Sequence, residues 1–237
     1  MTDRARRAFL QTSLAALTTA SAVQGAEPEK TSMADASSAS AFTRDLQPKP
    51  LPFDPKSLRS LSERLVVSHW ENNYGGAVKA LNAVRKKLQG MLGADDPPYI
   101  YNDLKREHLI RTGSVVLHEL YFGNLGGDGK APTETRAALS RAFGSFDTWQ
   151  SEFVRIGQGL GGGSGWVVLG FNEHLGLLEN YWLADHASNP PYTRPILVMD
   201  MYEHAYHMDY GAAAAKYIDA FFANINWDEV AKRMSPA

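Results

Sequence analysis

Two long helical patterns, separated by a short stretch rich in glycine and proline, constrain most strongly how this 237-residue chain can fold. In the first pattern, over residues 56–81, inward-facing positions recur at steps of four, which places them on one face of a helix. The second pattern covers residues 104–124 and is followed by a glycine-rich run. Residues 90–98 between them hold two glycines and two prolines, which end helices. The sequence therefore predicts an N-terminal α-helical hairpin.

The rest of the chain carries helix and strand patterns in an order typical of an α+β fold. The expected segments are two helices, at residues 134–143 and 146–158, and then a β-hairpin with strands at 166–171 and 176–184. A third, strongly apolar strand at 195–200 and a last helix at 201–225 follow. Ser145 is expected to cap the second of these helices. We predict two domains: a helical hairpin over residues 51–137, and a C-terminal lobe over residues 138–237 whose helices surround a three-stranded antiparallel sheet.

The N-terminal residues 1–26 resemble a twin-arginine export signal. Arg6 and Arg7 precede a small residue, a Phe and a Leu, and the uncharged stretch that follows is too polar for a membrane span. The alternative is a disordered basic terminus. Residues 27–50 are rich in Ser, Ala, Thr and Pro and predict a disordered linker or an extended arm. These features predict a periplasmic or otherwise exported protein, with no stable membrane insertion and with its cleavage site left open.

Composition excludes several kinds of chemistry. The chain has no cysteine, so disulfides, thiolate nucleophiles and sulfur-ligated metals are excluded. Its formal net charge of −2 comes with no basic stripe that could neutralise nucleic-acid phosphates. A tightly held metal would therefore have only His, Asp and Glu as ligands, a set that suits iron, manganese or zinc.

Four residues are candidate metal ligands. His69 shares a helix face with leucines, and His118 lies in an apolar stretch of the second helix. Asp200 and His204 are four apart where the last strand meets a helix, and a carboxylate there is costly unless a cation or donors compensate it. Taken singly, each histidine also fits a hydrogen-bonded core residue, and Asp200 fits an N-cap. Together, three imidazoles and one carboxylate would leave an open coordination position for solvent.

Residues 200–206 read DMYEHAY and are very similar to the D-x-W-E-H-A-Y signature of the iron/manganese superoxide dismutases. His69, twelve residues before a Leu-Asn pair, and His118, in LHELYF, match the family's histidine ligands on its first and second helices. The blocks FGSF, GSGW and NW match further along the chain, so the resemblance covers residues 51–234. It implies superoxide as the substrate and one Fe or Mn ion per chain, bound by His69, His118, Asp200 and His204.

The resemblance also implies residues around the metal. His186 falls where the family places a Gln or His that contacts metal-bound solvent. The family's gateway Tyr is Ala77 here, and the His usual four residues after the first ligand is Asn73. Tyr74 is a candidate for part of the missing hydroxyl's role. The resemblance thus makes His186, Asn73 and Tyr74 the candidate catalytic residues.

Two further consequences concern activity and assembly. The two Trp that commonly wall the metal are Phe122 and Tyr202. Because the gateway Tyr is missing and Tyr74 would replace it only in part, we expect dismutase activity that is weaker than usual or has a different pH dependence. Glu203 and His207 match the family's interface positions and imply a homodimer. The alternatives are a non-catalytic periplasmic metal-binding protein on the same scaffold and, less well supported, a hydrolytic zinc site. Iron or manganese, and dimer or tetramer, stay open at this stage.

Overall fold

The computed structural model describes residues 42–91 and 94–235. The described residues belong to one compact unit. The predicted export signal and most of the predicted linker lie outside the described residues, so both stay predictions. No helix in the described ranges is long and apolar enough to cross a membrane.

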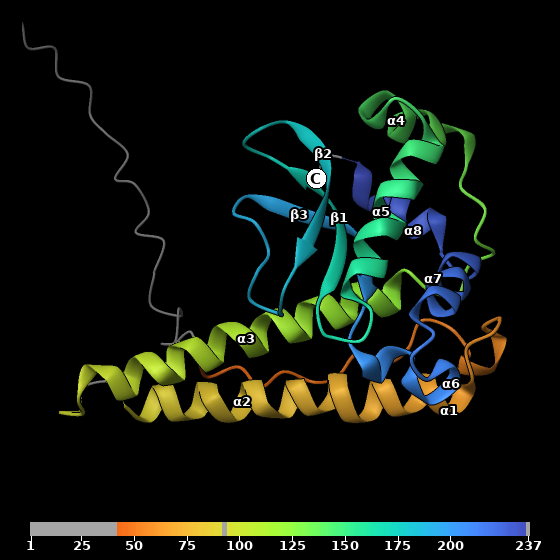
Figure 1. Ribbon diagram of the computed structural model, residues 1–237. Coiled ribbons are helices and arrows are strands. Elements are labelled where there is room, and N and C mark those ends of the chain that lie inside the picture. The colour runs from red at the N-terminus through yellow and green to blue at the C-terminus, as the bar shows by residue number, and fades with distance from the viewer. Residues whose placement is uncertain (1–41, 92–93, 236–237) are drawn as a thin grey trace, which may run out of the picture. The chain divides into compact units, whose positions relative to one another are not determined.

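The predicted helical hairpin is confirmed. The first half of the hairpin runs without a break through α1 (Glu63–Ser68), a π-helical turn η2 (His69–Tyr74) and α2 (Gly75–Gly90). The side chain of Ser62 accepts a hydrogen bond from the amide of Leu65 and so caps α1. The second half is α3 (Pro98–Gly123), which begins with a proline at its first position and lies alongside α2 in Figure 1.

Three antiparallel strands form the sheet, as predicted. They are β1 (Trp166–Asn172), β2 (Leu177–Leu183) and β3 (Thr193–Asp200), in the order β2-β1-β3. The register pairs Trp166 at the start of β1 with Asp200 at the end of β3. β1 is almost completely buried, which explains its apolar sequence. The sheet therefore brings the Asp200 side of β3 next to Trp166.

Helices cover the sheet. A short η1 (Pro55–Ser57) precedes the hairpin, and α4 (Thr133–Phe143) and α5 (Phe146–Leu160) follow it. Ser145 caps α5 by accepting a hydrogen bond from the amide of Thr148, as the sequence predicted. Figure 1 shows α5 packed beside the sheet, and the sheet standing over the C-terminal half of α3.

The expectation of one continuous helix over residues 201–225 was wrong. The segment instead forms η3 (Glu203–Ala205), α6 (His207–Tyr210) and α7 (Ala214–Ala223). The Asp200 carboxylate accepts a hydrogen bond from the amide of Tyr202, which competes with a regular helix start. Gly211, with φ +53°, then breaks the chain between α6 and α7.

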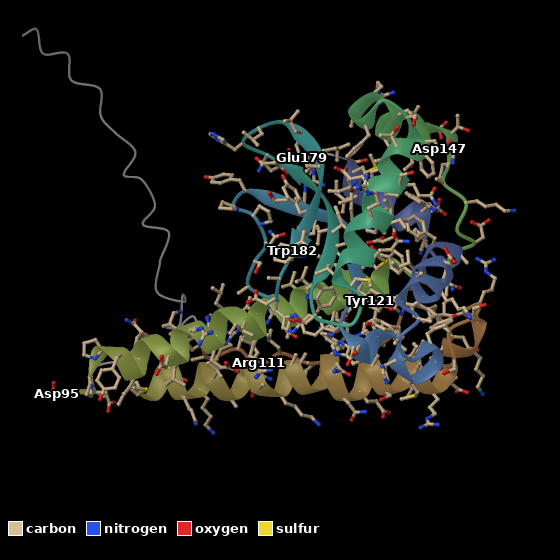
Figure 2. All side chains as sticks on the ribbon, viewed as in Figure 1. Asp95, Arg111, Tyr121, Asp147, Glu179 and Trp182 are labelled. Carbon is tan, nitrogen blue, oxygen red and sulfur yellow. The ribbon has the colours of Figure 1, made fainter. Side chains whose placement is uncertain are left out.

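A last helix, α8 (Trp227–Met234), closes the chain against β3 and α3. Its N-cap, Asn226, accepts a hydrogen bond from the amide of Glu229. The core beneath is strongly aromatic: Tyr121, labelled in Figure 2 where α3 passes the sheet, stacks on Phe221 of α7. This packing fixes α3 and α7 relative to each other.

Candidate metal centre

Four ligand-type side chains predicted from the sequence converge on one point. One donor atom each from His69, His118, Asp200 and His204 lies within 4.8 Å of the other three. These residues come from η2, α3, the end of β3 and η3, which are distant in sequence. In the described part of the chain this is the one group of three or more such residues with metal-site spacing.

The Asp200 carboxylate is the centre of the cluster. Its Oδ2 atom lies 3.1 Å from His69 Nε2, 3.1 Å from His204 Nε2 and 3.6 Å from His118 Nε2. Asp200 has no exposed surface, and a buried carboxylate is costly unless charge or hydrogen bonds compensate it. Burial alone would raise the pKa of Asp200, but the nearby His204 ring and the hydrogen bonds with His204 and His69 lower it overall.

His118 provides the test of whether a metal fits. Its Nδ1–H donates to the backbone oxygen of Ser114 at 2.7 Å, which leaves Nε2 as the unprotonated nitrogen. Nε2 is buried and has no hydrogen-bond partner among the described residues. Burial lowers the pKa of His118 to about 3, so the ring is neutral. A buried, unpaired nitrogen lone pair 3.6 Å from a carboxylate oxygen is an unfavourable arrangement that a cation bound by both would relieve.

The donor set itself is consistent with that test. Burial likewise lowers the pKa of His69, which is therefore a neutral ligand. Three neutral imidazoles and one carboxylate form a hard-to-borderline set of ligands that suits iron and manganese. The residues present thus fit a single redox metal.

Local structure explains how each element presents its ligand. The π-helical turn that begins at His69 widens the helix at the site, and such turns are frequent at functional positions. At the other side, the Tyr217 hydroxyl donates to the backbone oxygen of Asp200 at 2.7 Å. The 3-10 turn of η3 then returns His204 to the carboxylate of Asp200. Backbone and side-chain hydrogen bonds of the protein itself, which do not depend on a bound metal, therefore hold the ligands in place.

His186 lies beside this cluster. The Trp166 indole Nε1–H donates to His186 Nδ1 at 3.0 Å, so the neutral ring carries its proton on Nε2. The ring stacks on Tyr202 with centroids 4.8 Å apart, and it lies 5.9 Å from the ring of His118. Burial lowers the pKa of His186, which favours this neutral form.

Gly113 is a residue that the sequence interpretation missed. A Cβ atom on Gly113 would lie 1.7 Å from the backbone oxygen of His186, so only glycine lets α3 approach the loop that carries His186. A glycine inside an otherwise regular helix is unfavourable, and that cost was the available signal. In the sequence, Trp166 is only the last residue of the matching block GSGW, and its hydrogen bond to His186 has no sequence signal.

The other predicted residues lie around the cluster. Asn73 is half-buried in η2, and Ala77, at the family's gateway position, is buried in α2. The Tyr74 hydroxyl accepts a hydrogen bond from the amide of Lys49 and donates one to Glu119. The Tyr74 hydroxyl is therefore hydrogen-bonded to the N-terminal segment of the fold.

The two predicted interface residues are exposed. Glu203 and His207 lie next to each other, with His207 Nδ1 4.0 Å from Glu203 Oε1. The side chain of the nearby His204 keeps 24% of its surface exposed, in contrast to the buried His69 and His118. One side of the cluster is thus open on the single chain.

Comparison with known proteins identifies the family. The chain is 50% identical over 189 residues to a protein named superoxide dismutase [Fe] from Cupriavidus metallidurans, an alignment that covers 80% of this chain and 96% of that protein. The chain belongs to the iron/manganese superoxide dismutase family. Residues 131–233 match the family model for the C-terminal domain of iron/manganese superoxide dismutases.

Other members of the family are named with either metal. A superoxide dismutase [Fe] from Aquifex pyrophilus is 35% identical over 191 residues, covering 77% of this chain and 88% of that protein. A superoxide dismutase [Mn] from Mycolicibacterium smegmatis is 35% identical over 174 residues, covering 71% and 82%. The fold and the recognised family therefore agree with the sequence prediction.

Proposed function

We propose that this protein is a superoxide dismutase, which converts two superoxide anions and two protons into O₂ and H₂O₂ at a single Fe or Mn ion. The observation that carries the proposal is the convergence of His69, His118, Asp200 and His204, with the buried Nε2 of His118 left unpaired among the described residues. The proposed metal ligands are these four residues. When bound, the metal supplies one-electron exchange between two oxidation states.

The ligand set favours an anionic substrate. The three imidazoles are neutral ligands, and the one carboxylate, Asp200, neutralises a single positive charge of a divalent or trivalent ion. The site would therefore keep a net positive charge in a buried environment, where charges interact more strongly than in water. This charge attracts superoxide to the open side of the cluster.

We propose His186 as the residue that orients solvent and substrate at the open position. Because Trp166 fixes the proton of His186 on Nε2, that nitrogen is a hydrogen-bond donor. Stacking on Tyr202 restricts the orientation of the ring. Asn73 lies in η2, as His69 does. It is a second proposed polar contact for substrate or solvent, in place of the family's usual histidine.

The direct test is an assay of protein loaded separately with iron and with manganese. Superoxide decay is followed by stopped-flow absorbance, and the metal content of each sample is measured by inductively coupled plasma mass spectrometry. We expect activity to scale with bound metal, and a His118→Ala variant to lose both metal and activity. Activity no higher than that of the free metal would refute the proposal and favour a non-catalytic metal-binding protein, a role that Ala77 at the gateway position would suit.

Assembly is a separate proposal. The open side of His204, next to the exposed Glu203 and His207, supports a homodimer in which Glu203 bonds to the partner subunit's His204. Sedimentation velocity tests it. The wild-type chain should sediment as a dimer, and a Glu203→Ala variant should dissociate into monomers at protein concentrations at which the wild-type dimer stays intact. A monomeric wild-type protein with full activity would contradict it.

We also propose that the protein is exported to the periplasm by the twin-arginine route, on the evidence of Arg6, Arg7 and the stretch that follows them. Cell fractionation is the test. The wild-type chain should appear in the periplasmic fraction, and replacement of both arginines by lysine should retain it in the cytoplasm. Equal periplasmic amounts of the two proteins would contradict the proposal.

A further inference from the structure

The segment formed by residues 42–53, here called the N-terminal arm, lies against the helical hairpin. It contains no helix or strand and, in Figure 1, it runs along α2 and α3. Leu46, Leu51 and Phe53 of the arm pack against the core. Part of the segment predicted from composition as a linker is thus bound to the two helices that carry His69 and His118.

Side chains of the hairpin hold the backbone of the arm at two places. Asn82 binds both backbone groups of Leu46: its Oδ1 accepts from the amide at 3.0 Å and its Nδ2 donates to the carbonyl at 2.9 Å. Lys49 is bound in the same way by two residues. Its amide donates to the Tyr74 hydroxyl at 2.7 Å, and its carbonyl accepts from Trp70 Nε1 at 2.9 Å.

The Lys49 contacts join the two ligand-bearing helices. The ammonium group of Lys49 forms an ion pair with Glu119, which also accepts a hydrogen bond from the Tyr74 hydroxyl at 3.0 Å. Burial raises the pKa of Tyr74 to about 12, so its hydroxyl stays protonated as the donor. Trp70 directly follows the ligand His69, and Glu119 directly follows the ligand His118. One arm residue therefore contacts both helices at the level of the metal centre.

Tyr74 transmits these contacts to the ligands. It ends the π-helical turn that begins at His69, and only 1% of its surface is exposed. Its ring lies 6.4 Å from the ring of His118 and 6.2 Å from that of Phe122. The Asn82 contact has no such connection, because Asn82 lies thirteen residues beyond His69, roughly 20 Å along the helix.

We propose that Lys49, Trp70, Tyr74 and Glu119 form a staple, the Lys49 staple, which holds η2 and α3 together and slows the release of the metal. Lys49 and Tyr74 are positioning residues in this arrangement, since they act through His69 and His118. The inference rests on the proposed metal site but not on catalysis. Metal release requires ligands on the two helices to separate, and that local opening breaks the staple.

The test compares two variants of the full-length, iron-loaded protein. Tyr74→Phe removes the hydroxyl that binds Lys49 and Glu119 but keeps the ring against His118. Asn82→Ala is the matched control, because it frees the arm at Leu46, away from the ligands. Iron retained after timed exposure to excess chelator and desalting gives the release rate, and hydrogen exchange of the Lys49 and Leu46 amides reports arm binding.

We expect Tyr74→Phe to release iron on the order of tenfold faster than wild type, which corresponds to the loss of hydrogen bonding to a charged group. Asn82→Ala should release iron at the wild-type rate although the Leu46 amide loses protection. Equal release rates for the two variants, whether both fast or both unchanged, would overturn the proposal.

A second pair of variants covers the case in which Tyr74→Phe does not fold. The side chains of Lys49 and Glu119 are 72% and 22% exposed, so Lys49→Ala and Glu119→Gln leave the core intact. Each should speed iron release, and the double variant should release iron no faster than the faster single variant. Additive effects, or none, would overturn the proposal. Because release is measured with iron alone, an inactive wild-type protein would refute the proposed dismutase function without affecting this result.

Discussion

Substitution of Gly113 by alanine should separate metal binding from catalysis. The added Cβ would lie 1.7 Å from the backbone oxygen of His186 and 2.7 Å from its carbonyl carbon. Real Cβ atoms essentially never approach other atoms below 3.0 Å, and the obstacle is backbone rather than a flexible side chain. The loop that carries His186 must therefore move away from α3 by more than about 1 Å.

That displacement sets the expected magnitude. Overpacking of this kind costs about 1–3 kcal/mol in free energy of unfolding, and better helix propensity returns up to about 1 kcal/mol of it. A positioning group moved by about 1 Å can lower the rate by up to ~10²-fold. Since the four ligands are not on the displaced loop, metal content should stay at one ion per chain while kcat falls.

The assay is stopped-flow superoxide decay, normalised to bound metal, together with thermal unfolding. Gly159→Ala is the matched control, because Gly159 is an exposed glycine of α5 whose Cβ would meet nothing within 4 Å. The control should keep full kcat and gain about 0.5–1 kcal/mol in stability. If Gly113→Ala kept wild-type kcat per metal, the argument that this close approach positions His186 would be refuted.

Three further predictions follow from buried polar groups. Asn124→Ala should lower the free energy of unfolding by about 2–4 kcal/mol in urea denaturation, because it removes two hydrogen bonds of a buried side chain, one donated to the carbonyl of Val198 and one accepted from Arg233. The exposed Asn102→Ala should change it little. Asp200→Asn keeps the shape but removes the only anionic ligand, so elemental analysis should find less than about a tenth of the wild-type metal, and full retention would contradict the assigned ligand set. The metal-free protein should lose stability as the pH falls from 6.5 to about 3. Burial lowers the pKa of His118 to about 3 in the folded state, so the unfolded state binds more protons over this pH range. In a pH series of urea denaturation, a His118→Gln variant should show a shallower loss.

The four candidate ligands stand out in the sequence because their types contradict their surroundings, and the family resemblance groups them. His69 and His118 interrupt apolar helix faces, and Asp200 ends a strand that is otherwise apolar. Buried polar groups need partners, so residues of this kind are expected to meet one another. What the sequence could not supply was the geometry, in particular the hydrogen bond that fixes the tautomer of His186 through Trp166.

Local signals failed where distant contacts decide the structure. The alanine-rich stretch after His204 predicts a helix by propensity, but the hydrogen bond from Tyr202 to Asp200 and the positive φ of Gly211 break it. The arm has a linker's composition, and its binding depends on Tyr74 and Asn82, which are 25 and 36 residues away from the arm residues they bind. Such contacts have no counterpart in a local sequence pattern.

The most direct test of the central claim is a crystal structure of the iron- or manganese-loaded protein with anomalous diffraction at the absorption edge of the metal. The account predicts a single anomalous peak per chain, bonded to Nε2 of the three histidines and to the carboxylate of the aspartate. A peak elsewhere, or a bound ion from which any one of these four side chains is turned away, would contradict it.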